Sequence, residues 1–302
     1  MRYFSFALTA ALALSGALAG CRSASPPSSS ALLPPSTFAP NTELLLKILA
    51  VTDSWTGGVV LINDKGKKFG DITYGLGSPD GASYDSKGDL YVADPDNGQV
   101  QEYAPNATKP TFTYSHGLVA PVDVTTDSKF NVIVGDYAGA TITEFKQKSN
   151  KIEVQCSPGG NVQGVAYDVV HRTFFATTVE TTSLPGKIVE YKDGLTGCQD
   201  TALKPKLGFP GGIAVDPKEN LIACDQTPPA VYIIKPPYDK IDVTLKGLRV
   251  PFRPALNPKG NELFITDYAA KDVRVFFYPS LKRDTTLGSS SGLAAPQGVA
   301  MR

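Results

Sequence analysis

The sequence predicts an all-β fold built from small repeated sheets. Its 302 residues include 28 Gly and 24 Pro together with many Val, Tyr and Phe, and they contain few long helical runs. This composition is typical of chains with many short strands and tight turns. Basic and acidic side chains balance at 29 each, so the composition does not predict nucleic acid as a partner.

One segment recurs six times along the chain. The copies are SPDGASYD (78–85), APVDVTTD (120–127), NVQGVAYD (161–168), FPGGIAVD (209–216), VPFRPALN (250–257) and APQGVAMR (295–302). Successive copies are 42, 41, 48, 41 and 45 residues apart. Each of the first five is followed by a second apolar run, a third, and a weaker fourth. A period of about 40–45 residues that holds four strands predicts a β-propeller blade.

The two ends of the repeated region predict how the ring closes. The last segment, 295–302, is a first strand with nothing after it, whereas residues 46–75 supply second, third and fourth strands without a first. Together they complete one blade, which pins the two ends and removes a free sheet edge. The sequence therefore predicts a six-bladed β-propeller over residues 44–302, with the last blade closed by strands from both termini.

The repeat also resembles a known family. Residues 79–103 follow the pattern P-x-G-x-x-x-D-x-x-G-x-L-Y-V-A-D-x-x-N-x-x-V-x-x-Y, which resembles the NHL repeat. The resemblance covers residues from about 44 to 302 and implies the same six-bladed fold. Counted from 78–85, the third repeat departs from the pattern because Thr177 replaces the Asp, and the fifth because Arg253 replaces the Gly.

The N-terminus predicts export and lipid anchoring. Residues 1–20 carry one positive charge, an apolar run too short to span a membrane, and then small residues, as a signal peptide does. The LAGC that ends at Cys21 resembles a bacterial lipobox, which implies cleavage before Cys21 and acylation of this residue. Arg22 is compatible with transport to the outer membrane in a host with two membranes. The alternative is an ordinary signal peptide followed by a chance Cys.

Residues 21–43 differ in composition from the rest of the chain. They are rich in Ser and Pro and poor in charge, so they cannot bury enough apolar surface to offset their ordering entropy. We interpret them as a semi-stiff tether between the lipid and the propeller, and the alternative is a remnant of processing.

An Asp ends five of the predicted second strands. These residues are Asp53, Asp94, Asp136, Asp225 and Asp267. Five carboxylates at one repeat position could be mistaken for a metal ring. An Asp at a strand end can instead accept hydrogen bonds from its own following turn, and we favour this structural role.

The mouth of the channel where the first strands begin is the predicted place for chemistry. Gluconolactonases and senescence-marker-type lactonases, which are also six-bladed, hold a divalent cation with residues at these strand starts. The corresponding residues here are Asp80, Val122, Gln163, Gly211, Phe252 and Gln297. One carboxylate and two amides are a poor ligand set for a hard cation. We therefore expect no metal and no cofactor, and a metal-dependent lactonase remains the alternative function.

Aromatic residues on the same face favour a binding role. Trp55, Tyr137 and Tyr268 follow second strands, and Phe252 lies at a strand entrance. If exposed, they would form a rim suited to a protein, peptide or glycan, although packing between blades would account for them equally well. With Asp80, Gln163 and Gln297 they make up the candidate ligand site. The sequence thus predicts an extracytoplasmic, lipid-anchored binding or scaffolding module for an unknown ligand.

Cys and His residues indicate no catalytic centre. Three thiols besides Cys21 allow three single bridges, and we favour Cys156–Cys198 because both lie in outer parts of adjacent blades. Cys224 lies in an apolar strand and should pack as a small apolar residue. The chain has no C-x-x-C, and we interpret His116 and His171 as surface or packing residues.

Overall fold

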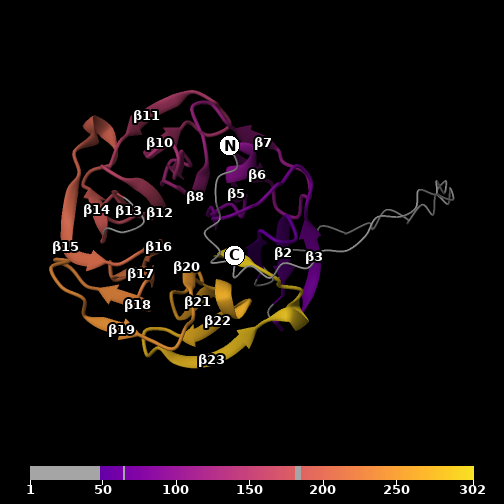
Figure 1. Cartoon of the computed structure of the whole chain (residues 1–302). Coiled ribbons are helices and arrows are strands. Elements are labelled where there is room, and N and C mark those ends of the chain that lie inside the picture. The colour runs from indigo at the N-terminus through magenta and orange to yellow at the C-terminus, as the bar shows by residue number, and fades with distance from the viewer. Residues whose placement is uncertain (1–47, 64, 181–184) are drawn as a thin grey trace, which may run out of the picture. The chain divides into compact units, whose positions relative to one another are not determined.

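The computed structural model describes residues 48–63, 65–180 and 185–302 (Figure 1). The predicted signal peptide, the predicted tether and Cys21 lie outside these residues. Within the described ranges, the helices are all too short or too polar to cross a membrane.

The described chain forms six four-stranded antiparallel sheets arranged as a ring (Figure 1). This arrangement confirms the predicted six-bladed β-propeller. In each blade the first strand lies innermost, and the inner strands contact one another all the way round the ring. The ends of these inner strands therefore define the two mouths of a central channel. We call the end where they begin the upper mouth, and the end where they finish the lower end.

The first three blades follow the chain in order. Blade one contains β4 (Ala82–Tyr84), β5 (Leu90–Asp94), β6 (Gln99–Tyr103) and β7 (Phe112–Tyr114). Blade two contains β8 (Pro121–Thr126), β9 (Val132–Asp136), β10 (Thr141–Phe145) and β11 (Ile152–Cys156). Blade three contains β12 (Asn161–Asp168), β13 (Thr173–Val179), β14 (Gly186–Tyr191) and β15 (Thr201–Leu207).

The remaining blades complete the ring. Blade four contains β16 (Pro210–Val215), β17 (Leu221–Gln226), β18 (Pro229–Ile234) and β19 (Val243–Leu245). Blade five contains β20 (Pro251–Leu256), β21 (Glu262–Asp267), β22 (Asp272–Phe277) and β23 (Lys282–Leu287). Blade six contains β24 (Pro296–Met301), β1 (Leu49–Asp53), β2 (Gly58–Ile62) and β3 (Lys68–Ile72). Four short 3-10 helices are η1 (Pro95–Asn97), η2 (Thr196–Cys198), η3 (Tyr268–Ala270) and η4 (Ser289–Ser291).

Blade six joins the two ends of the ring, as predicted. Antiparallel pairing places Leu49 of β1 opposite Met301 of β24. Beyond the strands, the amide of Arg302 donates to the carbonyl of Ile48 at 3.0 Å, and the reverse bond is 3.3 Å. This pairing gives each terminal strand a partner that it would otherwise lack.

The core is divided among the interfaces between blades. Six clusters of buried apolar side chains are present in the described chain, and each is shared by two neighbouring blades. Between blades five and six, for example, Val51 and Val60 pack in one cluster with Phe264 and Val275. Burial of such side chains from water supplies the main stabilising force, so each blade depends on both neighbours.

Glycines allow the inner strands to approach closely. A Cβ added at Gly164 of β12 would lie 2.6 Å from the Cα of Gly212 in β16. At Gly298 of β24 it would lie 3.0 Å from the Cα of Gly81. Any larger residue would push the backbones apart, so the repeated Gly serves the crowded centre.

The five repeated Asp residues have the predicted structural role and a second one. Each side chain is bonded within its own following turn, as Asp136 is to the amide of Gly139 at 2.9 Å. Each also accepts from two amides just before the inner strand of the same blade: Ala294 and Ala295 for Asp53, Gly77 and Ser78 for Asp94, Val119 and Ala120 for Asp136, Gly208 and Phe209 for Asp225, and Arg249 and Val250 for Asp267. The carboxylates therefore clamp the chain segment that enters each blade.

The register of blade three corrects one residue of the repeat alignment. Asp225 lies opposite Pro210 in blade four, and the residue with that place in blade three, opposite Val162, is Thr178. Thr177, which the sequence pattern aligned with the Asp, lies opposite Gly164. The turn before β13 is one residue longer than the turn before β17, and this insertion shifts the alignment by one.

The cysteines match the sequence-based prediction. Cys156 of β11 and Cys198 of η2 form a disulfide that joins the outer part of blade two to blade three. Cys224 is free and fully buried in β17. Burial raises the pKa of the Cys224 thiol far above its ordinary value, so this sulfur remains a protonated, packing side chain.

Candidate functional site

The upper mouth brings the predicted site residues around one opening. Val122, Gln163, Phe252 and Gln297 lie among the first three residues of inner strands, and Asp80 lies two residues before β4. Three threonines from second strands tie this ring together by donating to carbonyls of the next blade. Thr177 donates to Gly211 at 2.6 Å, Thr266 donates to Gln297 at 2.7 Å, and Thr52 donates to Asp80. The backbone around the mouth is therefore held by bonds between blades.

Arg253 of β20 crosses the channel below this ring. Its guanidinium donates to the carbonyls of Gln163 at 2.7 Å and Val122 at 2.6 Å. It also forms ion pairs with Asp80 at 2.9 Å and with Asp123 at 3.6 Å. One side chain of blade five thus contacts blades one, two and three, and it is 3% exposed. We call Arg253, Asp80 and Asp123 the channel ion cluster.

Burial governs the electrostatics of the channel ion cluster. It raises the pKa of Asp123 to about 6, although the Arg253 charge and the amide of Val165 oppose the shift. It also raises the pKa of Asp80, and again the charge of Arg253 reduces the effect. For Arg253 itself, burial lowers the pKa, but the two carboxylates outweigh it and the net shift is upward. The guanidinium therefore stays charged beside the two carboxylates.

Arg253 is a visible departure from the repeat, but the sequence alone assigns it no function. The signal is its position, because four of the other five blades have Gly at this place, where the inner strands crowd, and blade two has Asp123. Gly212 of the neighbouring strand leaves room for it, since an added Cβ there would lie 2.9 Å from the Arg253 Cγ. A long, charged side chain at a position where most blades have Gly cannot be packed within its own blade. It must therefore extend toward other blades.

The other predicted ligand-binding residues are dispersed around the mouth. Gln163 and Gln297 are buried, and the Gln297 amide nitrogen donates to Ser54 at 3.1 Å. Phe252 and Tyr268 pack against each other with ring centres 6.1 Å apart, and both are half-buried, as is Tyr137. Trp55 differs from these because it is 83% exposed. The structure therefore shows one prominent exposed aromatic side chain here, and the role of this set in ligand binding stays a prediction.

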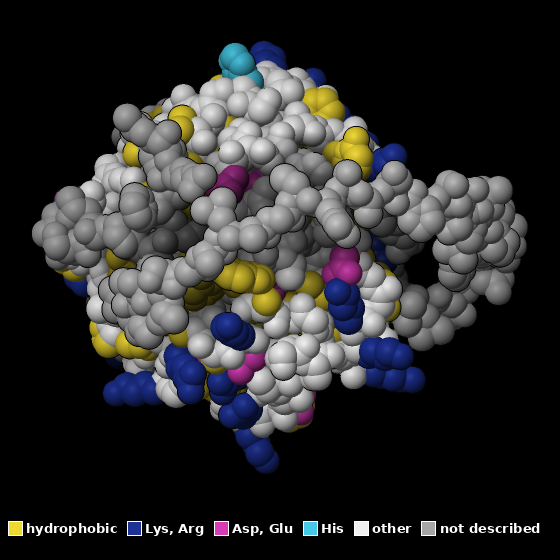
Figure 2. All heavy atoms as spheres, turned by 45° about the vertical axis from the view of Figure 1, so that its right-hand side comes forward, with side chains coloured by type: hydrophobic (Ala, Val, Ile, Leu, Met, Phe, Trp, Pro, Cys, Tyr) yellow, Lys and Arg dark blue, Asp and Glu magenta, His cyan; other side chains and the backbone are white. Residues whose placement is uncertain are grey.

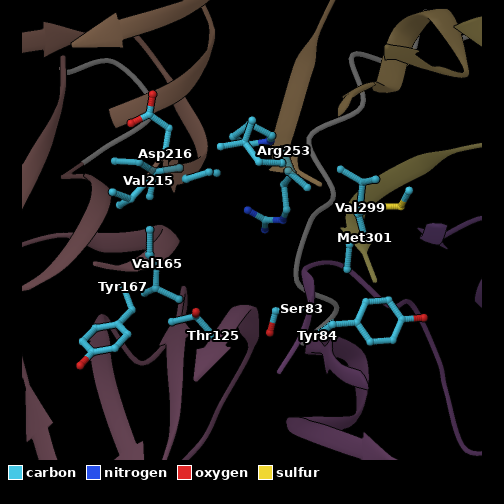
Figure 3. Close-up of a pocket in the computed structure, with 18 of the residues that line it drawn as sticks. Ser83, Tyr84, Thr125, Val165, Tyr167, Val215, Asp216, Arg253, Val299 and Met301 are labelled. Atoms are coloured by element: carbon cyan, nitrogen blue, oxygen red, sulfur yellow. The ribbon is translucent and has the colours of Figure 1, made fainter. Parts of the chain in front are cut away.

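The lower end of the channel contains a cavity of about 580 Å³ (Figure 3). The final residues of the six inner strands form its wall, with apolar side chains such as Val165, Val215 and Val299 beside the hydroxyls of Ser83 and Thr125. We call this cavity the lower funnel. Its volume lies within the range of about 300–1,000 Å³ that is usual for ligand pockets in proteins.

The inner end of the lower funnel and its outer rim differ in chemistry. Arg253 and Asp123 of the channel ion cluster line the inner end, so a buried ion pair forms part of the funnel wall. Val169 and Val170 lie on the rim and are 63% and 66% exposed. The exposed valines of the rim and the apolar side chains of a wall that also carries polar groups are suited to an apolar group of a ligand.

The two histidines lie in different parts of the fold. His116 is exposed in the connection between β7 and β8. His171 lies in the turn after β12, where its Nδ1 is 3.0 Å from a carboxylate oxygen of Asp168. Neither is bonded to a Ser or Cys side chain in the described part of the chain, so the geometry shows no nucleophile–base pair.

Comparisons with known proteins establish the fold alone. No protein-family model matches the sequence, and no curated protein is similar to it. A chain in the solved structure titled "Crystal structure of Nidogen/Laminin Complex" superposes with a TM-score of 0.72 at 18% identity, over 84% of this chain and 98% of that chain. Because 1292 solved chains match, the fold is too widely shared to indicate an activity.

Proposed function

We propose that this protein is a lipid-anchored, extracytoplasmic binding module with NHL-type blades, and that a protein partner inserts an apolar group into the lower funnel. The observation that carries this proposal is the open cavity of about 580 Å³ at the lower end of the channel. Exposed Val169 and Val170 beside it supply apolar contact area outside the cavity itself. Concave sites with apolar walls and a few placed polar groups are the usual geometry of binding sites.

The channel ion cluster argues against the lactonase alternative. A cation-dependent lactonase needs carboxylates that are free to bind the ion at the upper mouth. Asp80 is the one carboxylate among the six aligned strand-start positions, and it is paired with Arg253 at 2.9 Å. The guanidinium places a positive charge where the metal ion would have to bind. Binding therefore accounts for this mouth better than metal catalysis does.

Two further observations support a protein as the partner. The similar solved chain comes from a complex between two proteins, nidogen and laminin. On the face shown in Figure 2, Lys and Arg stand out at several places, most of them over its lower half. The balance of 29 basic and 29 acidic residues agrees with a surface that does not select a polyanion.

The anchoring half of the proposal depends on the sequence. An acylated Cys21 would hold the chain on a membrane, because each buried CH₂ contributes about 0.8 kcal/mol. The Ser/Pro-rich residues 21–43 would then act as a spacer between the lipid and the propeller. Replacement Cys21→Ser should release the protein from the membrane fraction or leave it unprocessed. A variant that is cleaved normally and still partitions fully with membranes would contradict the anchor.

The binding proposal can be tested with the full chain in a thermal-shift screen. The probes are a peptide library, a glycan panel and simple aldonolactones with added divalent cations. We expect peptides to raise the melting temperature of the parent, and Thr125→Trp, which fills the funnel, to abolish the shift. Trp55→Ala at the upper mouth is the matched control and should retain it. Aldonolactone hydrolysis that requires a metal ion and is lost in Asp80→Ala would overturn the proposal in favour of an enzyme.

A further inference from the structure

The turn that follows β12 differs from the equivalent turns in other blades. After β4, β8 and β16 an Asp accepts the amides two and four residues ahead, as Asp216 does from Lys218 and Asn220 at 2.8 Å each. In blade three, Asp168 bonds the amide of Val170 at 2.9 Å, and its second oxygen faces His171 instead. The cause is the inserted residue, which places an imidazole where the other turns have a backbone amide or an Asn.

A third side chain reaches the same point from the next blade. Glu219, in the turn after β16, has a carboxylate oxygen 3.5 Å from Nδ1 of His171, and a carboxylate oxygen of Asp168 lies 3.0 Å from the same nitrogen. The three atoms all lie within 4.8 Å of one another. Two neighbouring blades thus bring one nitrogen and two carboxylate oxygens together.

The charges in this cluster are not balanced by the protein. The ion pairs described for Asp168 and Glu219 are both made with His171, and no Lys or Arg of the described ranges pairs with either. A neutral imidazole has a single N–H, so Nδ1 can donate to at most one of the two carboxylates. With His171 neutral, the cluster carries two negative charges and lacks a cation.

The spacing of the three atoms fits a transition metal. Zinc binds His nitrogen and carboxylate oxygen at about 2.0–2.2 Å in tetrahedral geometry, which separates neighbouring ligand atoms by about 3.3 Å. The separations from Nδ1 are 3.0 Å and 3.5 Å, on either side of that value. The residue types also suit zinc, since imidazole and carboxylate are both among its usual ligands.

We infer that Asp168, His171 and Glu219 form a binding site for a divalent transition metal, with Zn²⁺ as the best match. The side chains of His171 and Glu219 are 54% and 35% exposed, so an ion can enter from solvent and keep a water as its fourth ligand. The ion clips the turns of blades three and four together. Because Asp168 also lines the lower funnel, the ion adds a positive charge to the funnel rim.

This site is independent of the proposed function and is tested without any organic ligand. Untagged full chain in detergent is titrated with Zn²⁺ by calorimetry, and Co²⁺ is added as a spectroscopic probe of tetrahedral geometry. We expect one equivalent of Zn²⁺ to bind and to raise the melting temperature. His171→Ala and Glu219→Gln should each weaken binding by about 100-fold or more, since losing a direct ligand exceeds the usual 10–100-fold cost of losing an outer contact.

The control is His116→Ala, which removes the other imidazole and leaves the cluster intact. It should bind Zn²⁺ as the parent does. Glu219→Gln keeps the shape of a partly exposed side chain, so its loss of binding would not reflect unfolding. The inference is overturned if the parent releases no heat with Zn²⁺, or if His171→Ala and Glu219→Gln bind it with unchanged affinity.

Discussion

The two ends of the central channel are built from the same six strands but have opposite properties. At the upper mouth, Arg253 joins Asp80 and Asp123 in a buried ion cluster. At the lower end, the same strands finish in a mixture of apolar and polar side chains and leave a cavity of about 580 Å³. The two ends of one propeller channel therefore differ in character, because a single long side chain, Arg253, joins three blades near the upper mouth.

Deletion of residues 295–302 should have the largest effect on stability, because it removes residues from both ends of the channel at once. The deleted strand β24 carries Gln297 at the mouth and Val299 in the funnel wall, and it pairs with β1. Loss of this inner strand should cost several kcal/mol, a large share of a typical stability of about 5–15 kcal/mol. Urea denaturation should show a large fall in midpoint. A truncated chain that melts within a degree or two of the parent would contradict the shared blade.

Replacement of Arg253 by Ala tests the upper mouth specifically. It leaves Asp80 and Asp123 without their cation in a buried site, and removal of one partner of a buried ion pair costs about 3–5 kcal/mol. The free energy of unfolding, measured with urea, should fall by about that amount. Arg249→Ala, at an exposed residue just before the same strand, should stay within about 0.5 kcal/mol of the parent. Equal effects of the two variants would show that the cluster does not hold the mouth.

Asp123→Asn tests the channel ion cluster through the pH dependence of the free energy of unfolding. The folded-state pKa of Asp123 is about 6, above its ordinary value of 3.8, so the protonated carboxyl favours folding. Its contribution is fully present below pH about 4 and is lost as pH rises through about 6, and two pKa units correspond to about 3 kcal/mol. The unfolding free energy of the parent minus that of Asp123→Asn should therefore decline between pH 4 and pH 6. A difference that stays flat over this range would place the titrating group elsewhere.

The fold could be predicted from the sequence because each blade is a local unit with its own signals. Repeated strand starts, turn residues and the half-blades at 46–75 and 295–302 are all visible along the chain. The channel ion cluster was not predictable in the same way. Arg253 and Asp80 are 173 positions apart, and which side chains meet across a ring depends on the radius of the channel and on neighbouring glycines.

The lower funnel was not predictable from the sequence either. The resemblance to six-bladed lactonases directed attention to the strand starts, where Asp80 lies. The lower funnel lies where the strands finish, and its wall mixes apolar, hydroxyl and charged side chains that carry no motif. A cavity depends on volumes left unfilled in three dimensions, and periodicity alone does not report them.

Filling the lower funnel should have the smallest effect on stability and a selective effect on binding. Thr125 lines a cavity of about 580 Å³, so a Trp side chain at this position has room to enter without displacing the core. Thr125→Trp should therefore change the free energy of unfolding by less than about 1 kcal/mol, in contrast to Arg253→Ala. Thr125→Val keeps the volume of the side chain and serves as the control. If Thr125→Trp proves as destabilising as Arg253→Ala, then the lower end is packed as tightly as the upper mouth. That result would contradict the difference that we describe between the two ends of the channel.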